Sequence, residues 1–131
     1  MPQLGFKKHF PPLIKADKKP FTLRALRKDG RDPKAGQMLY MFTDLRQKSC
    51  KKFAEKMCRF AVNIRLHSNK VEIPGLASLS RPTDLDTFAR LDGFEDFTAC
   101  RSFHGINSGD VKTMRLIAWF TLDELKEMLL R

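Results

Sequence analysis

The sequence of 131 residues lacks several features that would define its class directly. Its three cysteines form no C-x-x-C pair and its three histidines are scattered, so neither a disulfide framework nor a zinc site is indicated. No run of 18 apolar residues occurs, and the N-terminal residues contain no apolar stretch of signal-peptide length. We therefore expect a soluble cytoplasmic protein that does not associate with a membrane. We also expect that it binds no metal and no cofactor.

The sequence also contains no internal repeat and no low-complexity linker. Its mass of 15.2 kDa is typical of one domain, and its 42% of hydrophobic residues, with 11 phenylalanines among them, can supply a core. We expect residues 1–131 to form a single domain.

Acidic residues are scarce in the first half of the chain. Residues 1–70 contain 18 Lys and Arg against 5 Asp and Glu, whereas residues 71–131 contain 7 against 10. The formal net charge of +10 therefore comes from the first half. Such an excess attracts polyanions, because each neutralised phosphate releases counterions. The charge favours nucleic acid as the partner, and a solvated basic face is the alternative.

Short elements of both kinds are expected from hydrophobic periodicity, prolines and capping residues. Apolar residues alternate with polar ones in most of the predicted strands, and the last strand is apolar on both faces, as a central strand would be. The expected strands are residues 21–25, 38–42, 58–66, 71–73 and 114–120. The expected helices are residues 11–14, 83–92, 95–103 and 121–129. Residues 48–57 fit either a strand or a helix. The predicted class is α+β.

Two places break local rules, and such breaks tend to mark functional sites. The first is a cluster of cations around the segment in which Pro20 holds Lys19 in extended geometry. Thr22 and Arg24 share one face of the strand that follows. Repulsion between like charges would lower the pKa of Lys19 and favour its neutral amine. The alternative interpretation of this cluster is a basic loop that is only solvated and has no functional role.

The second place is Asp92, at the end of a predicted helix and before Gly93. A carboxylate there faces the negative end of the helix dipole, which costs about 0.3–1 kcal/mol unless a cation compensates. We therefore expect a positive group near Asp92. The alternative is that Asp92 only caps a turn, as aspartate often does.

Three blocks of the sequence resemble, in order, the motifs of the ASCH domain family. Residues 16–24 (A-D-K-K-P-F-T-L-R) resemble its G/D-[KR]-K-x-x-T-[IL]-R motif. Residues 36–50 (G-Q-M-L-Y-M-F-T-D-L-R-Q-K-S-C) resemble G-D-x-L-x-L-Y-T-G-M-R-T-K-x-C, and residues 89–97 (A-R-L-D-G-F-E-D-F) resemble A-x-x-D/E-G-F. The resemblance implies a small mixed PUA-like β-barrel of about five or six strands with flanking helices, and a cleft for RNA or a modified nucleoside.

The resemblance also implies candidate catalytic residues. Some bacterial ASCH proteins hydrolyse the acetyl amide of N4-acetylcytidine with a Lys, a Thr and a Glu, and the matching positions here are Lys19, Thr22 and Asp92. Amide hydrolysis needs a nucleophile or base, a group that activates it, and a carboxylate that exchanges protons. Lys19, Thr22 and Asp92 would take these roles in that order, with Asp92 one methylene shorter than the glutamate of the hydrolases.

Nucleic-acid binding is the leading interpretation of the resemblance, through cations that contact phosphates and an aromatic ring that stacks on a base. The expected binding residues are Lys18, Arg24, Tyr40, Phe42, Arg46 and Lys48. Other ASCH members cleave single-stranded RNA with a Tyr and a Lys, so the resemblance also leaves a single-strand ribonuclease as a further alternative. Here Phe42 stands at the tyrosine position and Tyr40 is the nearest substitute. A basic surface that binds an acidic protein partner is the remaining alternative.

Overall fold

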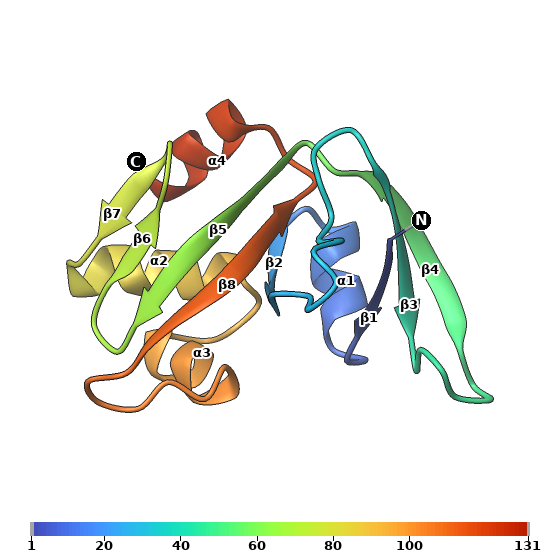
Figure 1. Cartoon of the computed structure of the whole chain (residues 1–131), viewed down its shortest axis with the longest axis horizontal. Helices are drawn as coiled ribbons and strands as arrows, with labels where there is room; N and C mark the ends of the chain where they lie inside the picture. The colour runs from blue at the N-terminus through green and yellow to red at the C-terminus, as the bar shows by residue number, and fades with distance from the viewer. Residues whose placement is uncertain (1, 131) are drawn as a thin grey trace.

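A computed structural model of the chain describes residues 2–130, which form an α+β fold with eight strands and four helices (Figure 1). The three-stranded sheet has the order β1-β3-β4, and the five-stranded sheet has the order β2-β8-β5-β6-β7. The strands are β1 (Gln3–Phe6), β2 (Phe21–Ala25), β3 (Met38–Thr43), β4 (Lys51–Met57), β5 (Phe60–His67), β6 (Val71–Ile73), β7 (Ala77–Leu79) and β8 (Val111–Ala118). The helices are α1 (Phe10–Lys15), α2 (Pro82–Leu91), α3 (Phe97–Phe103) and α4 (Leu122–Leu129).

Strand β8 lies between β2 and β5. Its residues 116–118 are buried on both faces, as their apolar sequence predicts, whereas residues 111–113 are exposed. Leu116 packs into the core under α2 and α3, whereas its neighbour Ile117 packs into a second core between the two sheets. The two cores therefore meet across one central strand.

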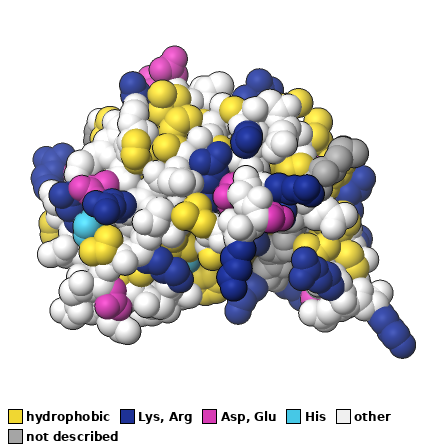
Figure 2. Space-filling model, viewed as in Figure 1, with side chains coloured by type: hydrophobic (Ala, Val, Ile, Leu, Met, Phe, Trp, Pro, Cys, Tyr) yellow, Lys and Arg dark blue, Asp and Glu magenta, His cyan; other side chains and the backbone are white. Residues whose placement is uncertain are grey.

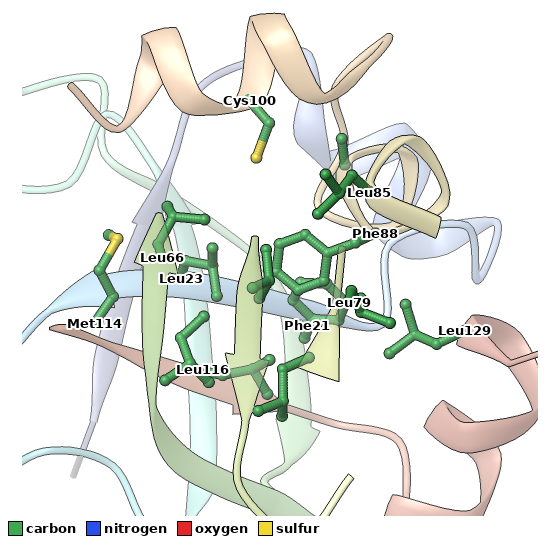
Figure 3. Close-up of a cluster of buried hydrophobic side chains, with 14 of the residues drawn as sticks. Phe21, Leu23, Leu66, Leu79, Leu85, Phe88, Cys100, Met114, Leu116 and Leu129 are labelled. Atoms are coloured by element: carbon green, nitrogen blue, oxygen red, sulfur yellow. The ribbon is translucent and has the colours of Figure 1, made fainter. Parts of the chain in front are cut away.

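The larger core fills the space between the five-stranded sheet and helices α2, α3 and α4 (Figure 3). Phe21 of β2 stacks on Phe88 of α2 with ring centroids 5.2 Å apart, and Cys100 of α3 points into the same cluster. Burial of each large side chain contributes about 1.5–3 kcal/mol to folding. This core holds α2 and α3 against the sheet, and the ends of these two helices carry part of the site described below.

The second core joins the two sheets and contains the only tryptophan, Trp119. Phe6 of β1 contacts Trp119 edge-to-face at 6.4 Å between centroids, and it contacts Phe10 of α1 in the same way at 6.2 Å. Helix α1 therefore packs between β2 and the three-stranded sheet.

The two sheets are linked differently on their two sides. On one side β4 continues through Cys58 and Arg59 into β5. On the other side β1 and β2 are the edge strands of their sheets, and a side chain joins them, because Arg24 Nη2 donates to the Gly5 carbonyl oxygen at 2.7 Å. Within residues 2–130 the sheets are not closed into a barrel, so the expected PUA-like barrel is not confirmed.

The α+β class and most predicted elements are confirmed, and residues 51–57 are a strand. The bounds of several elements differ by up to three residues from those predicted, as in β8, which spans residues 111–118 and not 114–120, and β1 and β7 were not predicted. Helix α2 begins at Pro82, one residue before the expected start at Thr83, and its N-cap is Arg81. Proline is favoured in the first turn of a helix, which explains the earlier start. Phe103, the last residue of α3, is 48% exposed and lines a cavity. None of the helices formed by residues 2–130 has the length and apolar composition needed to cross a bilayer.

Candidate functional site

Lys19 and Asp92, 73 residues apart in sequence, form a buried ion pair. Lys19 Nζ lies 2.9 Å from Asp92 Oδ1, and each side chain is 2% exposed. The same ammonium also donates to the backbone carbonyl oxygen of Asp92, which is the C-cap residue of α2. Lys19 thus compensates both the carboxylate and the negative end of the helix dipole. The cation expected near Asp92 is present, and it is Lys19.

The backbone on both sides of the pair is fixed by local geometry. The amides of Lys18 and Lys19 both donate to the Leu13 carbonyl, so the chain reverses directly after α1. Gly93 has a φ of +96°, and a Cβ there would lie 2.7 Å from the ring of Phe10. Only glycine meets both requirements. The turn after α2 therefore brings Phe10, Lys19 and Asp92 together.

The second carboxylate oxygen of Asp92 is also engaged. His104 Nε2 lies 2.9 Å from Asp92 Oδ2, and the Cys100 thiol donates to the same oxygen at 3.6 Å. His104 is the C-cap residue of α3 and is buried. Burial, followed by the charge of Asp92, raises the pKa of Cys100, which therefore stays a thiol. Sequence reasoning missed His104 and Cys100, although their i, i+4 spacing places them on one helix face.

The pKa of Lys19 is lowered, as expected, but the main cause differs from the one predicted. Burial is the largest effect and disfavours the charged amine, while Asp92 acts in the opposite direction. Repulsion from Arg24, the predicted cause, is a smaller contribution. Desolvation in the protein interior is therefore what makes Lys19 unusual.

A cavity of about 200 Å³ opens beside this ion pair. Its polar wall is formed by Lys19, Thr22, Arg24, Asp92 and His104. The structure thus brings together all three predicted catalytic residues and one predicted phosphate-binding residue. Thr22 Oγ1 accepts a hydrogen bond from Arg24 Nε at 3.4 Å, so the closest described partner of the hydroxyl is Arg24 and not Lys19.

The rest of the cavity wall is largely aromatic. Lys19 Nζ lies 4.7 Å from the centroid of the Phe10 ring, and the Arg24 guanidinium lies 4.7 Å from that of Phe6. Phe94 and Phe103 also line the cavity, with ring centroids 5.0 Å apart. The cavity is smaller than the roughly 300–1,000 Å³ of sites for drug-sized ligands. It has room only for a small group, and its wall offers both aromatic faces and hydrogen-bonding side chains.

The other predicted binding residues lie outside this cavity. Tyr40 and Phe42 are half-buried on the face of β3 opposite to its core residues, whereas Lys18, Arg46 and Lys48 are exposed. Phe42 pairs with Gly5 of the cavity-lining strand β1, so this region adjoins the cavity through one strand. Asp44, at the position of a turn glycine in the ASCH motif, has a φ of +51°, a conformation that aspartate tolerates.

Asp92, Cys100 and His104 also place three potential metal-ligand atoms within 4.8 Å of one another. One observation disfavours a cation there. The ammonium of Lys19 already neutralises the Asp92 carboxylate at 2.9 Å. The cluster is better described as a hydrogen-bonded support for Asp92.

Comparison of the chain with known proteins gives no match to a family model, to a curated protein or to a solved structure. The ASCH resemblance therefore depends on the three sequence blocks.

Proposed function

We propose that the cavity beside Lys19 binds the base of an RNA nucleotide or of a modified nucleoside. The observation that carries this proposal is the convergence of Lys19, Thr22, Arg24 and Asp92 on one base-sized cavity with aromatic walls. Aromatic faces stack on any base, and converging donors and acceptors can read its edge. The regional positive charge would attract the phosphates of such a ligand.

Membership of the ASCH family, with a fold derived from a PUA-like barrel, is part of this proposal. Two blocks that resemble the family motifs, residues 16–24 and 89–97, contribute the two halves of the buried ion pair. The two sheets, joined where β4 runs into β5, would then be an opened form of the barrel.

Hydrolysis of an N4-acylated cytidine is the second candidate function. It is favoured by the buried amine of Lys19, which has a lowered pKa and lies beside a carboxylate. With Lys19 as base, a water molecule would add to the acetyl carbonyl carbon and lose a proton to the Lys19–Asp92 pair. That proton would then pass to N4 as the C–N bond breaks, giving acetate and cytidine. Thr22 would hold the amine or the substrate through its hydroxyl.

Binding can be tested by calorimetric titration with cytidine, N4-acetylcytidine and a short single-stranded RNA. We expect Thr22→Val to weaken binding of each bound ligand on the order of tenfold, because it removes a buried hydroxyl and keeps the side-chain shape. Thr113→Val is the matched control, since Thr113 is exposed on β8 and lies outside the cavity. Equal effects of the two substitutions, or no binding by the wild type, would contradict the proposal.

Hydrolysis can be followed by the release of acetate and cytidine from N4-acetylcytidine. Lys19→Ala should abolish turnover. Full activity of this variant would exclude the assigned mechanism, and binding without turnover by the wild type would leave binding as the function. Lys19→Met, which keeps the length of the side chain, separates loss of the amine from loss of packing.

A further inference from the structure

Two further cavities adjoin the one beside Lys19. A cavity of about 220 Å³ shares Arg24 with it, and is lined by Gln3 and Leu4 of β1 and by Ala25 of β2. A third cavity of about 360 Å³ shares Arg27 with the second. We call the second and third cavities together the β1–β2 groove. It reaches the loop of residues 26–37 and meets the Lys19 cavity at the Arg24 side chain, which donates to the Gly5 carbonyl oxygen of β1.

The groove is lined by cations that have no fixed role in the fold. Arg27, Arg31 and Lys34 are exposed, and no interaction among residues 2–130 occupies their side chains. Two carboxylates also line the groove, but each accepts a hydrogen bond from the loop backbone. Asp32 Oδ1 accepts from the Arg27 amide and Asp29 Oδ1 from the Arg31 amide, both at 2.9 Å. The acidic groups therefore shape the loop that presents the cations.

The loop itself is anchored to strand β8 and to the link between β4 and β5. Arg115 of β8 donates to the Pro33 carbonyl oxygen through Nη2 at 2.9 Å and through Nε at 3.2 Å. The Gly36 amide donates to the Cys58 carbonyl at 2.8 Å. Figure 2 shows Lys and Arg side chains over the centre of the face in view, with a few acidic side chains among them. The backbone that carries the loop cations is thus held in place before any ligand binds, which reduces the entropy cost of ordering the loop.

We infer that the β1–β2 groove binds the phosphates of a single-stranded RNA while one base of that RNA occupies the Lys19 cavity. This inference rests on the proposed function. The cavity has room for one base, so neighbouring nucleotides need a path away from it, and the groove is cationic and meets the cavity at Arg24. Arg24, which lines both, would contact the nucleotide whose base is inserted, and Arg31 and Lys34 would contact phosphates further along.

The test is a double substitution, Arg31→Gln with Lys34→Gln, which removes two groove cations. Its control is Arg90→Gln with Lys126→Gln, which removes two exposed cations from α2 and α4. RNA affinity is measured by filter binding with a single-stranded decamer between 50 and 200 mM salt. For single strands the logarithm of the affinity changes with that of the salt concentration by about 0.7 per phosphate contact. The groove variant should therefore lose about 1.4 of this slope and on the order of tenfold in affinity, and the control much less.

Nucleoside titrations separate this inference from the proposed function. The groove variant should bind cytidine or N4-acetylcytidine as the wild type does, because its substitutions lie outside the Lys19 cavity. RNA binding that is sensitive to Thr22→Val but has the same salt slope in both double variants would overturn the groove and keep the cavity. A poly-glutamate peptide that binds in a groove-dependent manner, in place of RNA, would overturn the inference in favour of an acidic protein partner.

Discussion

Two basic regions of this protein place the same kinds of residue in opposite environments. Lys19 and Arg24 are enclosed, and each has partners at defined distances. Arg46 and Lys48 lie exposed in the turn between β3 and β4. An enclosed cation acts through fixed geometry, and loss of its partner destabilises the fold strongly. An exposed cation acts mainly through its field, which salt screens. Only the enclosed region has a geometry that can position a ligand.

The largest expected effect comes from breaking the enclosed pair. Asp92→Ala leaves the ammonium of Lys19 buried and without its carboxylate, and we expect it to lower the free energy of unfolding by about 3–5 kcal/mol. Urea denaturation followed by circular dichroism measures this loss. The double variant Lys19→Met with Asp92→Leu removes both charges and should be more stable than Asp92→Ala. If the double variant is the less stable of the two, the unpaired charge of Lys19 is not the main cause of the loss of stability in Asp92→Ala.

Gly93→Ala should have the next largest effect, about 1–3 kcal/mol in the free energy of unfolding. The φ of +96° is unfavourable for alanine, and its Cβ would collide with the ring of Phe10. Gly30→Ala is the matched control, since Gly30 also has a positive φ of +71° but no atom within 4 Å of a built Cβ. Thermal denaturation measures the loss of stability in each variant. The difference between the two losses gives the cost of the contact between the new Cβ and the Phe10 ring. Equal losses would mean that the site tolerates a methyl group there.

The pH dependence of stability should also distinguish the enclosed lysine. The pKa of Lys19 in the folded protein lies below its ordinary value of 10.5, so between these two values the unfolded chain binds more protons than the folded one. Stability of the wild type should therefore rise with pH through this window, relative to Lys19→Met. Denaturation of both proteins from pH 7 to pH 10 gives the comparison. A constant difference would show that the pKa of Lys19 is not lowered.

The smallest effect on stability is expected in the exposed region. Lys48→Glu should change the free energy of unfolding by no more than about 0.5 kcal/mol. If the turn contacts RNA, the variant should bind more weakly at low salt and with a salt slope reduced by about 0.7 per lost contact. RNA binding that is identical to that of the wild type would remove Arg46 and Lys48 from the proposed binding surface and leave the enclosed cavity and its groove.

Most elements that could be predicted from the sequence have enough residues to show a period, although the three-residue strand β6 was also predicted. The apolar sequence of residues 114–120 indicated a central strand, and the predicted last helix begins with a capping box at Thr121. Strands β1 and β7, with four and three residues, are too short to show a period and were not predicted. Whether β1 and β2 would pair and close a barrel depends on contacts between distant segments, which local patterns do not contain.

The site was predicted only in part, because some of its residues meet only in the fold. The place of Asp92 at the negative end of a helix dipole indicated a nearby cation, and the motif blocks indicated Lys19, Thr22 and Arg24. The sequence could not show that Lys19 would be enclosed, because enclosure depends on Phe10 and Gly93 from separate segments. For the same reason, burial was not foreseen as the main cause of its pKa shift.

The position of Trp119 gives the molecule an optical probe of its own. It is the only tryptophan, it is 5% exposed, and its indole N–H has no hydrogen-bond partner among residues 2–130. Its ring contacts Phe6, which in turn lies against the Arg24 guanidinium at the junction of the cavity and the groove. Emission from this single residue should therefore shift when a ligand moves Arg24, so occupancy can be followed without attaching any label.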